Sequence, residues 1–265
     1  MARLLFIFFF LAGPVYSWTT PVPRGYWIVS KDASILYGAT DFHGNYKIAQ
    51  WSIPEELPAF RDNITENDHM RVVWDRKSRT TRVTLRGNDL PCNDELDGYI
   101  SPLSMVYSDS LSGYKRIRLS VSIRREDVFV SSFGCDITQG GDLVGIVFFN
   151  EKARQKLFYQ LRFSNIRMNP DARYWWRNGM RHPDGWVSWG YRDQLSSYGE
   201  SVSGVGLWET YDLNLNRRIK QLIKARPGMD HDLGHWKIRN IYYGSHIWGD
   251  MEISTSWKNV RLIAK

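Results

Sequence analysis

Apolar and polar residues alternate along much of the chain. The clearest predicted strand is residues 115–123, where Ile117, Leu119, Val121 and Ile123 alternate with arginines and serines. Alternation with a period of two is typical of a β-strand that buries one face. Residues 143–149 are apolar almost without a break, which indicates a strand covered on both faces. Further strands are predicted at residues 26–29, 71–74, 80–85, 127–133, 157–163, 204–212, 236–243, 248–254 and 260–264.

One segment has a helical pattern instead. Between residues 214 and 225, Leu215, Ile219, Leu222 and Ile223 recur at helical spacing among basic residues. This predicts a short amphipathic helix, which the following Pro-Gly pair ends. Many short strands with a single helix favour an all-β fold, an antiparallel two-sheet β-sandwich of the jelly-roll type.

The first residues have the pattern of a secretory signal peptide. Arg3 precedes an unbroken apolar run over residues 4–11, and Val15-Tyr16-Ser17 places modest side chains near a cleavage point. The run is shorter than the roughly 20 residues that span a bilayer. We therefore expect residues 1–17 to be a signal peptide and residues 18–265 to be a single β-sandwich domain. The mature protein would then be secreted, in a periplasmic or extracellular compartment.

Cys92 and Cys135 are the two cysteines of the chain. In an oxidising compartment a lone pair of cysteines most often forms a disulfide, and neither residue lies in a nucleophile motif. We therefore predict a Cys92–Cys135 disulfide. Asn63-Ile64-Thr65 is a glycosylation acceptor if the source is eukaryotic.

The net charge is +7, or +6 once Arg3 is removed with the signal peptide. A basic exported protein suits acidic polysaccharides, anionic membranes or nucleic acid. The charges are spread along the chain without long lysine or arginine runs, however, and spread charge usually forms solvated faces. Nucleic acid is therefore not favoured as a partner.

Tryptophans, tyrosines and charged residues are densest over residues 174–198. The glycines and Pro183 in this segment predict a loop on the sandwich. Indole faces can cover the apolar face of a sugar ring while polar groups bind its hydroxyls. We predict a saccharide site made of Trp175, Trp176, Arg177, His182, Asp184, Trp186 and Trp189. The same residues also suit core packing or a protein interface.

A second polar cluster lies at residues 230–236. Its histidines and carboxylates are metal-ligand types, and the flanking glycines predict a loop that could wrap a cation such as calcium. The candidate ligands are Asp230, His231, Asp232 and His235. The alternative is a polar turn that leads into the strand at Trp236.

A third candidate surrounds His246. Gly244 and Gly249 frame His246 and Trp248, which predicts a turn or bulge between two strands. His246 is a candidate general base, with Tyr242 or Tyr243 as acid, and His182 is a further candidate. Such a set would serve β-elimination of a uronic-acid polymer. A glycosidase would need two carboxylates instead, and the sequence offers Asp184, Asp193, Glu200, Glu209 and Asp250 without singling out any pair.

The closing stretch carries a resemblance to a known fold family. Trp236-Lys237-Ile238, Tyr243-Gly244, Trp248-Gly249 and residues 256–262 resemble the final strands of secreted jelly-roll sandwiches, of the concanavalin A-like and carbohydrate-binding-module kind. The resemblance implies a sandwich and a carbohydrate ligand. The arginine-glutamate and glutamine-histidine strand motifs of the alginate-lyase branch are absent from the sequence, and no catalytic residue follows from the resemblance.

These patterns favour a secreted carbohydrate-binding protein that uses its tryptophan-rich segment to hold a polysaccharide. One alternative is a polysaccharide-cleaving enzyme, a lyase or a glycoside hydrolase, on the same scaffold. The other is a module that binds a protein or a membrane surface, which would present a flat aromatic patch. No cofactor is firmly implied, and no stretch after residue 17 is long and apolar enough to span a membrane.

Overall fold

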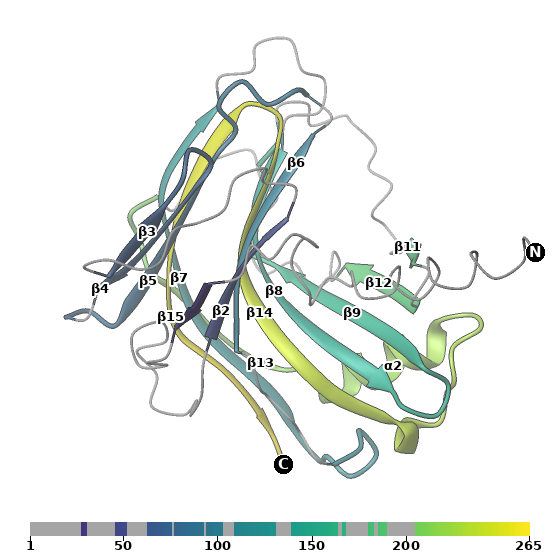
Figure 1. Ribbon diagram of the computed structural model, residues 1–265. Helices are drawn as coiled ribbons and strands as arrows, with labels where there is room; N and C mark the ends of the chain where they lie inside the picture. Colours follow the sequence, from purple (N-terminus) through teal and green to yellow (C-terminus); the bar gives the residue numbers. More distant parts are fainter. Residues whose placement is uncertain are drawn as a thin grey trace, which may run out of the picture.

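The computed structural model describes residues 28–30, 46–51, 63–75, 77–92, 94–102, 109–130, 139–163, 166–167, 180–182, 185–189 and 205–265. Their strands form two packed sheets, as Figure 1 shows. Within these residues the predicted antiparallel jelly-roll sandwich with one α-helix is confirmed, apart from a parallel pairing of two strands of the larger sheet. The predicted signal peptide and the first part of the predicted domain lie outside the described residues.

The larger sheet has the strand order β1-β2-β6-β14-β8-β9-β12-β11, and β10 pairs with β8. Its long central strands, β8 and β14, carry the predicted aliphatic runs into the core. The strands are β1 (Ile28–Ser30), β2 (Tyr46–Trp51), β6 (Glu95–Pro102), β8 (Gln139–Asn150), β9 (Gln155–Arg162), β10 (Ile166–Arg167), β11 (Met180–His182), β12 (Gly185–Trp189) and β14 (Trp236–Trp248).

The smaller sheet has the order β13-β7-β15-β5-β4-β3. Its alternating strands bury one face and leave arginines and serines on the other, as their period of two predicts. The strands are β3 (Ile64–Glu66), β4 (Met70–Asp75), β5 (Thr80–Arg86), β7 (Ile117–Val130), β13 (Glu209–Asn214) and β15 (Met251–Ala264).

One core fills the space between the sheets. Phe148 and Tyr243 of the larger sheet and Trp257 of the smaller sheet belong to it, each 2% exposed or less. Helix α2 (Asn216–Ala225) adds Ile219 and Ile223, both 0% exposed. The amphipathic pattern thus correctly predicted both the helix and the side that it buries.

The structure corrects the strand predictions at several places: β13 begins only at Glu209, and β2, β3, β6 and β10 were not predicted. Residues predicted as two strands form the single strand β7, and another predicted pair forms β15. β14 runs through Gly244 without the predicted turn. A β-carbon at Gly244 would lie 2.0 Å from the carbonyl oxygen of Gly98. This glycine therefore allows β6 to approach closely, and the turn comes later, at Gly249 and Asp250.

The segment predicted as a tryptophan-rich loop contains two short strands. β11 and β12 pair antiparallel, with His182 opposite Gly185, and β12 pairs with β9 in parallel. A parallel neighbour requires a long connection, and the chain between Arg162 and Gly185 is long enough to provide one. Within the described residues, no helix is long and apolar enough to cross a membrane.

Candidate functional site

A row of polar side chains lies on the outer face of the larger sheet, which we define as the face that points away from the smaller sheet. On β6, Leu96 and Ile100 belong to the core. Since side chains alternate along a strand, Glu95, Asp97 and Tyr99 point to the outer face. Asp97 and Tyr99 are nevertheless buried, and Glu95 is partly exposed.

Two other strands complete this cluster. β14 contributes Tyr242 and His246, and His246 is the cross-strand partner of Asp97. β9 contributes Gln160 and Arg162 from the far side of β8. All four of these side chains are 7% exposed or less. We call Glu95, Asp97, Tyr99, Gln160, Arg162, Tyr242 and His246 the outer-face cluster.

Glycines on β8 let side chains from β9 and β14 meet. A β-carbon added to Gly145 would come within 1.9 Å of the Tyr242 ring. The ring therefore lies over β8, where Gln160 Nε2 donates a hydrogen bond to the Tyr242 hydroxyl at 3.0 Å. Similarly, Gly141 is the β8 residue paired with His246, and Arg162 Nη1 lies 2.9 Å from His246 Nε2.

The carboxyl group of Asp97 is only half satisfied. The Tyr99 hydroxyl donates a hydrogen bond to Asp97 Oδ1 at 2.5 Å, and Tyr99 packs edge-to-face on Tyr242 with ring centroids 5.0 Å apart. Asp97 Oδ2 and Gln160 Oε1 are buried and have no hydrogen-bond partner among the described residues. Buried acceptors without partners are rare, and these two atoms can each accept a hydrogen bond from a hydroxyl group.

The two acidic residues of the cluster are unusually weak acids. Burial raises the pKa of Asp97 to about 7, against the opposing effects of the Tyr99 hydrogen bond and the charge of Arg162. Burial and the nearby charge of Asp97 raise the pKa of Glu95 well above its usual range. The pair therefore retains a proton near neutral pH, as acid–base catalysis requires.

Arg162 and His246 form the basic part of the cluster. Because arginine can only donate, His246 Nε2 accepts, and the ring carries its proton on Nδ1. Burial and the charge of Arg162 hold the pKa of His246 well below its usual value. Burial lowers the pKa of Arg162 to about 10, so it stays charged at neutral pH. His246 is therefore neutral there, with one ring nitrogen occupied.

The predicted catalytic set is only partly brought together. His246 lies in the cluster, but Tyr243 points to the opposite side of the sheet. There it packs on Trp257, with ring centroids 5.3 Å apart. Alternation along β14 instead puts Tyr242 beside His246. His182 belongs to β11, and its side chain lies outside the described part of the structure.

Sequence analysis missed Glu95, Asp97, Tyr99, Gln160 and Arg162. One signal was available: Glu95, Asp97 and Tyr99 alternate with Leu96 and Ile100, which is the period of a strand with polar groups on one face. Arg162 and Gln160 have no such signal, because their role depends on which strands become neighbours.

Most of the predicted saccharide site cannot be placed. Trp175, Trp176, Arg177 and Asp184 lie outside the described residues. The backbones of Trp186 and Trp189 belong to β12, where Trp189 is the register partner of Gln160. The end of this segment is thus attached to the strand that carries part of the outer-face cluster, and the saccharide site itself stays a prediction.

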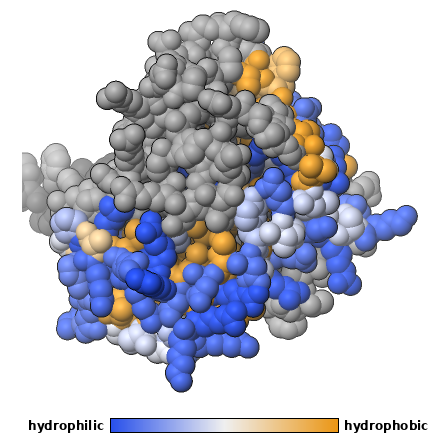
Figure 2. All heavy atoms as spheres, turned by 180° about the vertical axis from the view of Figure 1, so that it is seen from behind, coloured by the Kyte–Doolittle hydropathy of each residue, from blue (hydrophilic) through white to orange (hydrophobic). Residues whose placement is uncertain are grey.

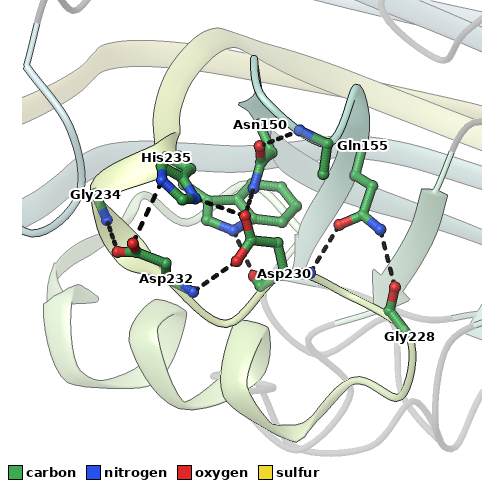
Figure 3. A network of polar contacts seen from close by, with 9 residues as sticks. Asn150, Gln155, Gly228, Asp230, Asp232, Gly234 and His235 are labelled. Carbon is green, nitrogen blue, oxygen red and sulfur yellow. Dashed lines mark hydrogen bonds and ion pairs between the residues drawn. The ribbon is translucent and has the colours of Figure 1, made fainter.

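The predicted metal ligands form a hydrogen-bonded turn. Figure 3 shows His235 between Asp230 and Asp232. His235 Nδ1 lies 2.6 Å from Asp230 Oδ2, and Nε2 lies 3.4 Å from Asp232 Oδ2. Asn150 Nδ2 also donates to Asp230, at 3.0 Å. This turn includes the short 3₁₀-helix η4 (Leu233–His235).

The side chains that were predicted to bind a metal instead form hydrogen bonds with one another and with the backbone. His231 Nε2 lies 3.2 Å from the Arg226 carbonyl oxygen, and Asp232 Oδ1 accepts from the Gly234 N–H at 2.9 Å. Among the residues that the structure describes, no group of three or more histidines, cysteines or acids is arranged to hold a metal ion. The predicted ligands form a polar turn before Trp236, and cation binding by this turn stays a prediction.

The remaining candidates are scattered or unplaced. Glu209 is exposed on β13 and accepts from the Tyr211 hydroxyl, whereas Asp250 lies at the turn between β14 and β15. Asp193 and Glu200 lie outside the described residues. Cys135 does too, so the Cys92–Cys135 disulfide stays a prediction.

Comparisons with known proteins concern the fold. No family model and no curated protein matches the sequence. A cellulase derived from Cel12A of Rhodothermus marinus has a similar structure, with a TM-score of 0.50 and 10% identity over 91% of this chain and 97% of that chain. The family 11 xylanase from Neocallimastix patriciarum gives a TM-score of 0.47 and 10% identity over 83% of this chain and 91% of that chain. At such low identity the likeness with a TM-score of 0.50 shows the fold alone, the β-sandwich architecture of jelly-roll proteins.

Proposed function

We propose that this protein is a glycoside hydrolase that acts on a polysaccharide over the outer face of the larger sheet. The observation that carries the proposal is the pair Glu95 and Asp97, two carboxyl groups with raised pKa values on one face of one strand. Glycosidases need such a pair, because one group protonates the leaving oxygen while the other acts on the anomeric carbon or its water.

The positions of the two groups suggest their roles. Glu95 is partly exposed and retains its proton, so it is the proposed proton donor. Asp97 is 1% exposed, and its unpartnered Oδ2 suits a small nucleophile such as water. Side chains two residues apart on a strand are separated by about 7 Å. That spacing lies in the range typical of inverting enzymes, which leave room for a water molecule.

The fold gives the proposal further support. The solved structure with a TM-score of 0.50 is a cellulase, so a sandwich of this kind can carry polysaccharide hydrolysis. Fold alone does not determine chemistry, and the argument therefore depends on the carboxyl pair. In this proposal β-elimination has less support, since the neutral His246 is a weak base with its Nε2 occupied by Arg162.

Non-catalytic carbohydrate binding is the second candidate. It is favoured by hydrogen bonds within the cluster, which hold its side chains in place: Tyr99 binds Asp97, Gln160 binds Tyr242, and Arg162 binds His246. A fixed polar floor with spare acceptors at Asp97 and Gln160 also suits the hydroxyls of a bound sugar. The tryptophan-rich segment would then supply the apolar contacts.

One experiment separates these candidates. The mature protein is incubated with cellulose, xylan and mixed-linkage glucan, and new reducing ends and polymer retention are measured. We expect reducing ends, and we expect Glu95→Gln to lower their rate by about 10²-fold or more, because it removes general acid catalysis. Glu151→Gln, at an exposed turn, is the matched control and should keep full activity.

The outcomes are distinct. If the protein retains a polymer but produces no reducing ends, the proposal of hydrolysis is wrong and non-catalytic binding is supported. If the Glu95→Gln variant still produces reducing ends at the full rate, the catalytic site lies outside the outer-face cluster. Product formed with the original anomeric configuration would refute the inverting role of Asp97.

A further inference from the structure

Helix α2 carries a row of cations on its surface. Arg217, Lys220 and Lys224 are spaced three and four residues apart, which places them on one face of the helix. From residue 216 to residue 226 the chain has five cations and no acidic residue. At 1.5 Å per residue, the row is about 10 Å long.

A second segment brings more positive charge to this helix. Asn216 Nδ2 donates a hydrogen bond to the Lys115 carbonyl oxygen at 2.9 Å. Lys220 Nζ donates to the Tyr114 carbonyl oxygen, also at 2.9 Å. The chain before β7 is thus fixed beside α2. We call Lys115, Arg116, Arg217, Lys220 and Lys224 the α2 basic surface.

The charges of this surface are not neutralised by the described residues around them. Lys115, Arg116, Arg217 and Lys224 form no ion pair with any residue of the described chain, and all four are exposed. The smaller sheet differs in this respect. Most of its arginines are paired with carboxylates, for example Arg86 with Glu66 at 2.8 Å, whereas the cations of the α2 basic surface have no such partner among the described residues.

The helix carries this charge at a cost to its own stability. Arg217 and Arg218 lie in the first turn, which has no acidic residue and no side-chain cap. The helix dipole favours anions at this end and disfavours cations. Burial and, after it, the charge of Arg218 lower the pKa of Arg226, so the cations of α2 also repel one another. Helix stability therefore does not explain the cations of the first turn, whereas Lys224 lies in the last turn, where the dipole favours a cation.

We propose that the α2 basic surface binds an anionic polysaccharide with repeating carboxylate or sulfate groups. A row of fixed cations suits a polymer with regularly spaced charges. The side of the molecule that carries α2 shows mostly hydrophilic residues (Figure 2). This surface is separate from Glu95, and the proposal does not depend on catalysis there.

Other polyanions fit the surface less well. Membrane binding needs apolar side chains beside the cations, but Leu215, Ile219 and Ile223 of this region are 5% exposed or less because they fill the core. Leu222 is partly buried and packs against the same core. Binding of single-stranded nucleic acid commonly uses aromatic side chains that stack on bases. The aromatic residue of the described segments at this surface is Tyr114, which is 5% exposed.

The test compares two variants with equal charge. Arg217→Gln/Lys224→Gln removes two cations of the α2 basic surface. Lys77→Gln/Arg79→Gln removes two exposed cations from the β4–β5 hairpin, on the other side of the molecule (Figure 1). Affinity is measured for heparin and polygalacturonate, for neutral xylan, and for vesicles of phosphatidylglycerol and phosphatidylcholine, at about 0.1 M and about 1 M salt.

We expect the full-length protein to bind heparin or polygalacturonate at low salt and to release it at high salt. The α2 variant should bind roughly tenfold more weakly, and the hairpin variant should match the unmodified protein within about twofold. Equal affinities of the two variants would refute the proposal. So would binding of the vesicles without binding of either acidic polymer. The Glu95→Gln variant should keep polyanion binding. Loss of hydrolysis would therefore leave the polyanion proposal intact, and loss of polyanion binding would leave the proposal of hydrolysis intact.

Discussion

The ring of Tyr242 occupies the space that a side chain at Gly145 would need. A β-carbon at position 145 would lie 1.9 Å from the ring, although the two residues belong to different strands, β8 and β14, which are paired at this point. The glycine therefore allows the ring to lie over β8 and reach Gln160. Tyr242 in turn packs on Tyr99, which binds Asp97.

This relationship predicts that Gly145→Ala lowers stability and disturbs the outer-face cluster. Overpacking a buried site typically costs about 1–3 kcal/mol of the free energy of unfolding. Urea unfolding measures the loss, and hydrolysis or polymer retention measures the effect on the site. Gly113→Ala is the control, because a β-carbon there meets only an ordinary contact at 3.5 Å. Unchanged stability of the Gly145→Ala variant would show that the ring can lie elsewhere.

Asp97 predicts a pH dependence of stability with a definite sign. Its pKa is about 7 in the folded protein and about 4 in an unfolded chain. A carboxyl group whose pKa is higher in the folded than in the unfolded state stabilises the fold fully at pH values below the pKa of the unfolded state. This contribution is lost as the pH rises toward the pKa of the folded state. Relative to Asp97→Asn, the unmodified protein should lose roughly 2–4 kcal/mol of the free energy of unfolding between pH 4 and pH 8. Urea unfolding at several pH values measures this difference, and a difference of opposite sign would contradict the raised pKa.

His246 predicts the opposite slope. Burial and Arg162 lower its pKa, so the unfolded chain binds more protons than the fold below about pH 6.5. The unmodified protein should therefore lose stability relative to His246→Gln as pH falls from 7 to 5, by up to about 1.4 kcal/mol per pH unit. Glutamine keeps an acceptor for Arg162. The two variants serve as controls for each other. If low pH destabilised the protein non-specifically, the stability difference from the unmodified protein would change with pH in the same direction for both variants.

Asp142 joins the two sheets inside the core. It is 0% exposed, and its Oδ1 accepts hydrogen bonds from Ser245 Oγ at 2.8 Å and Thr255 Oγ1 at 2.7 Å. Arg125 Nε lies 3.6 Å from its Oδ2. Asp142→Ala would remove the shared acceptor of these groups and should lower the free energy of unfolding by about 3 kcal/mol or more. Asp127→Ala, at an exposed position on β7, should have a small effect, and equal losses in the two variants would show that the buried network adds little.

Local patterns predicted most elements because they depend on neighbouring residues. The alternation from Ile117 to Ile123 and the helical spacing from Leu215 to Ile223 correspond to β7 and α2. Errors arose where a residue served a distant strand. Gly244 has the local appearance of a turn residue, but it is required by the close approach of β6.

The sequence by itself therefore determined the helix, the two-layer sandwich and the strands with clear periodicity, since periodicity decides which face of an element is buried. It did not reveal the strands β6, β11 and β12. Only the tertiary structure decided the candidate site. Glu95 and Asp97 meet Arg162 and His246 because β6, β14, β8 and β9 are neighbours in one sheet. That neighbourhood depends on pairing between strands far apart in the chain. It also buries the carboxyl groups, and burial is the physical reason that their pKa values rise.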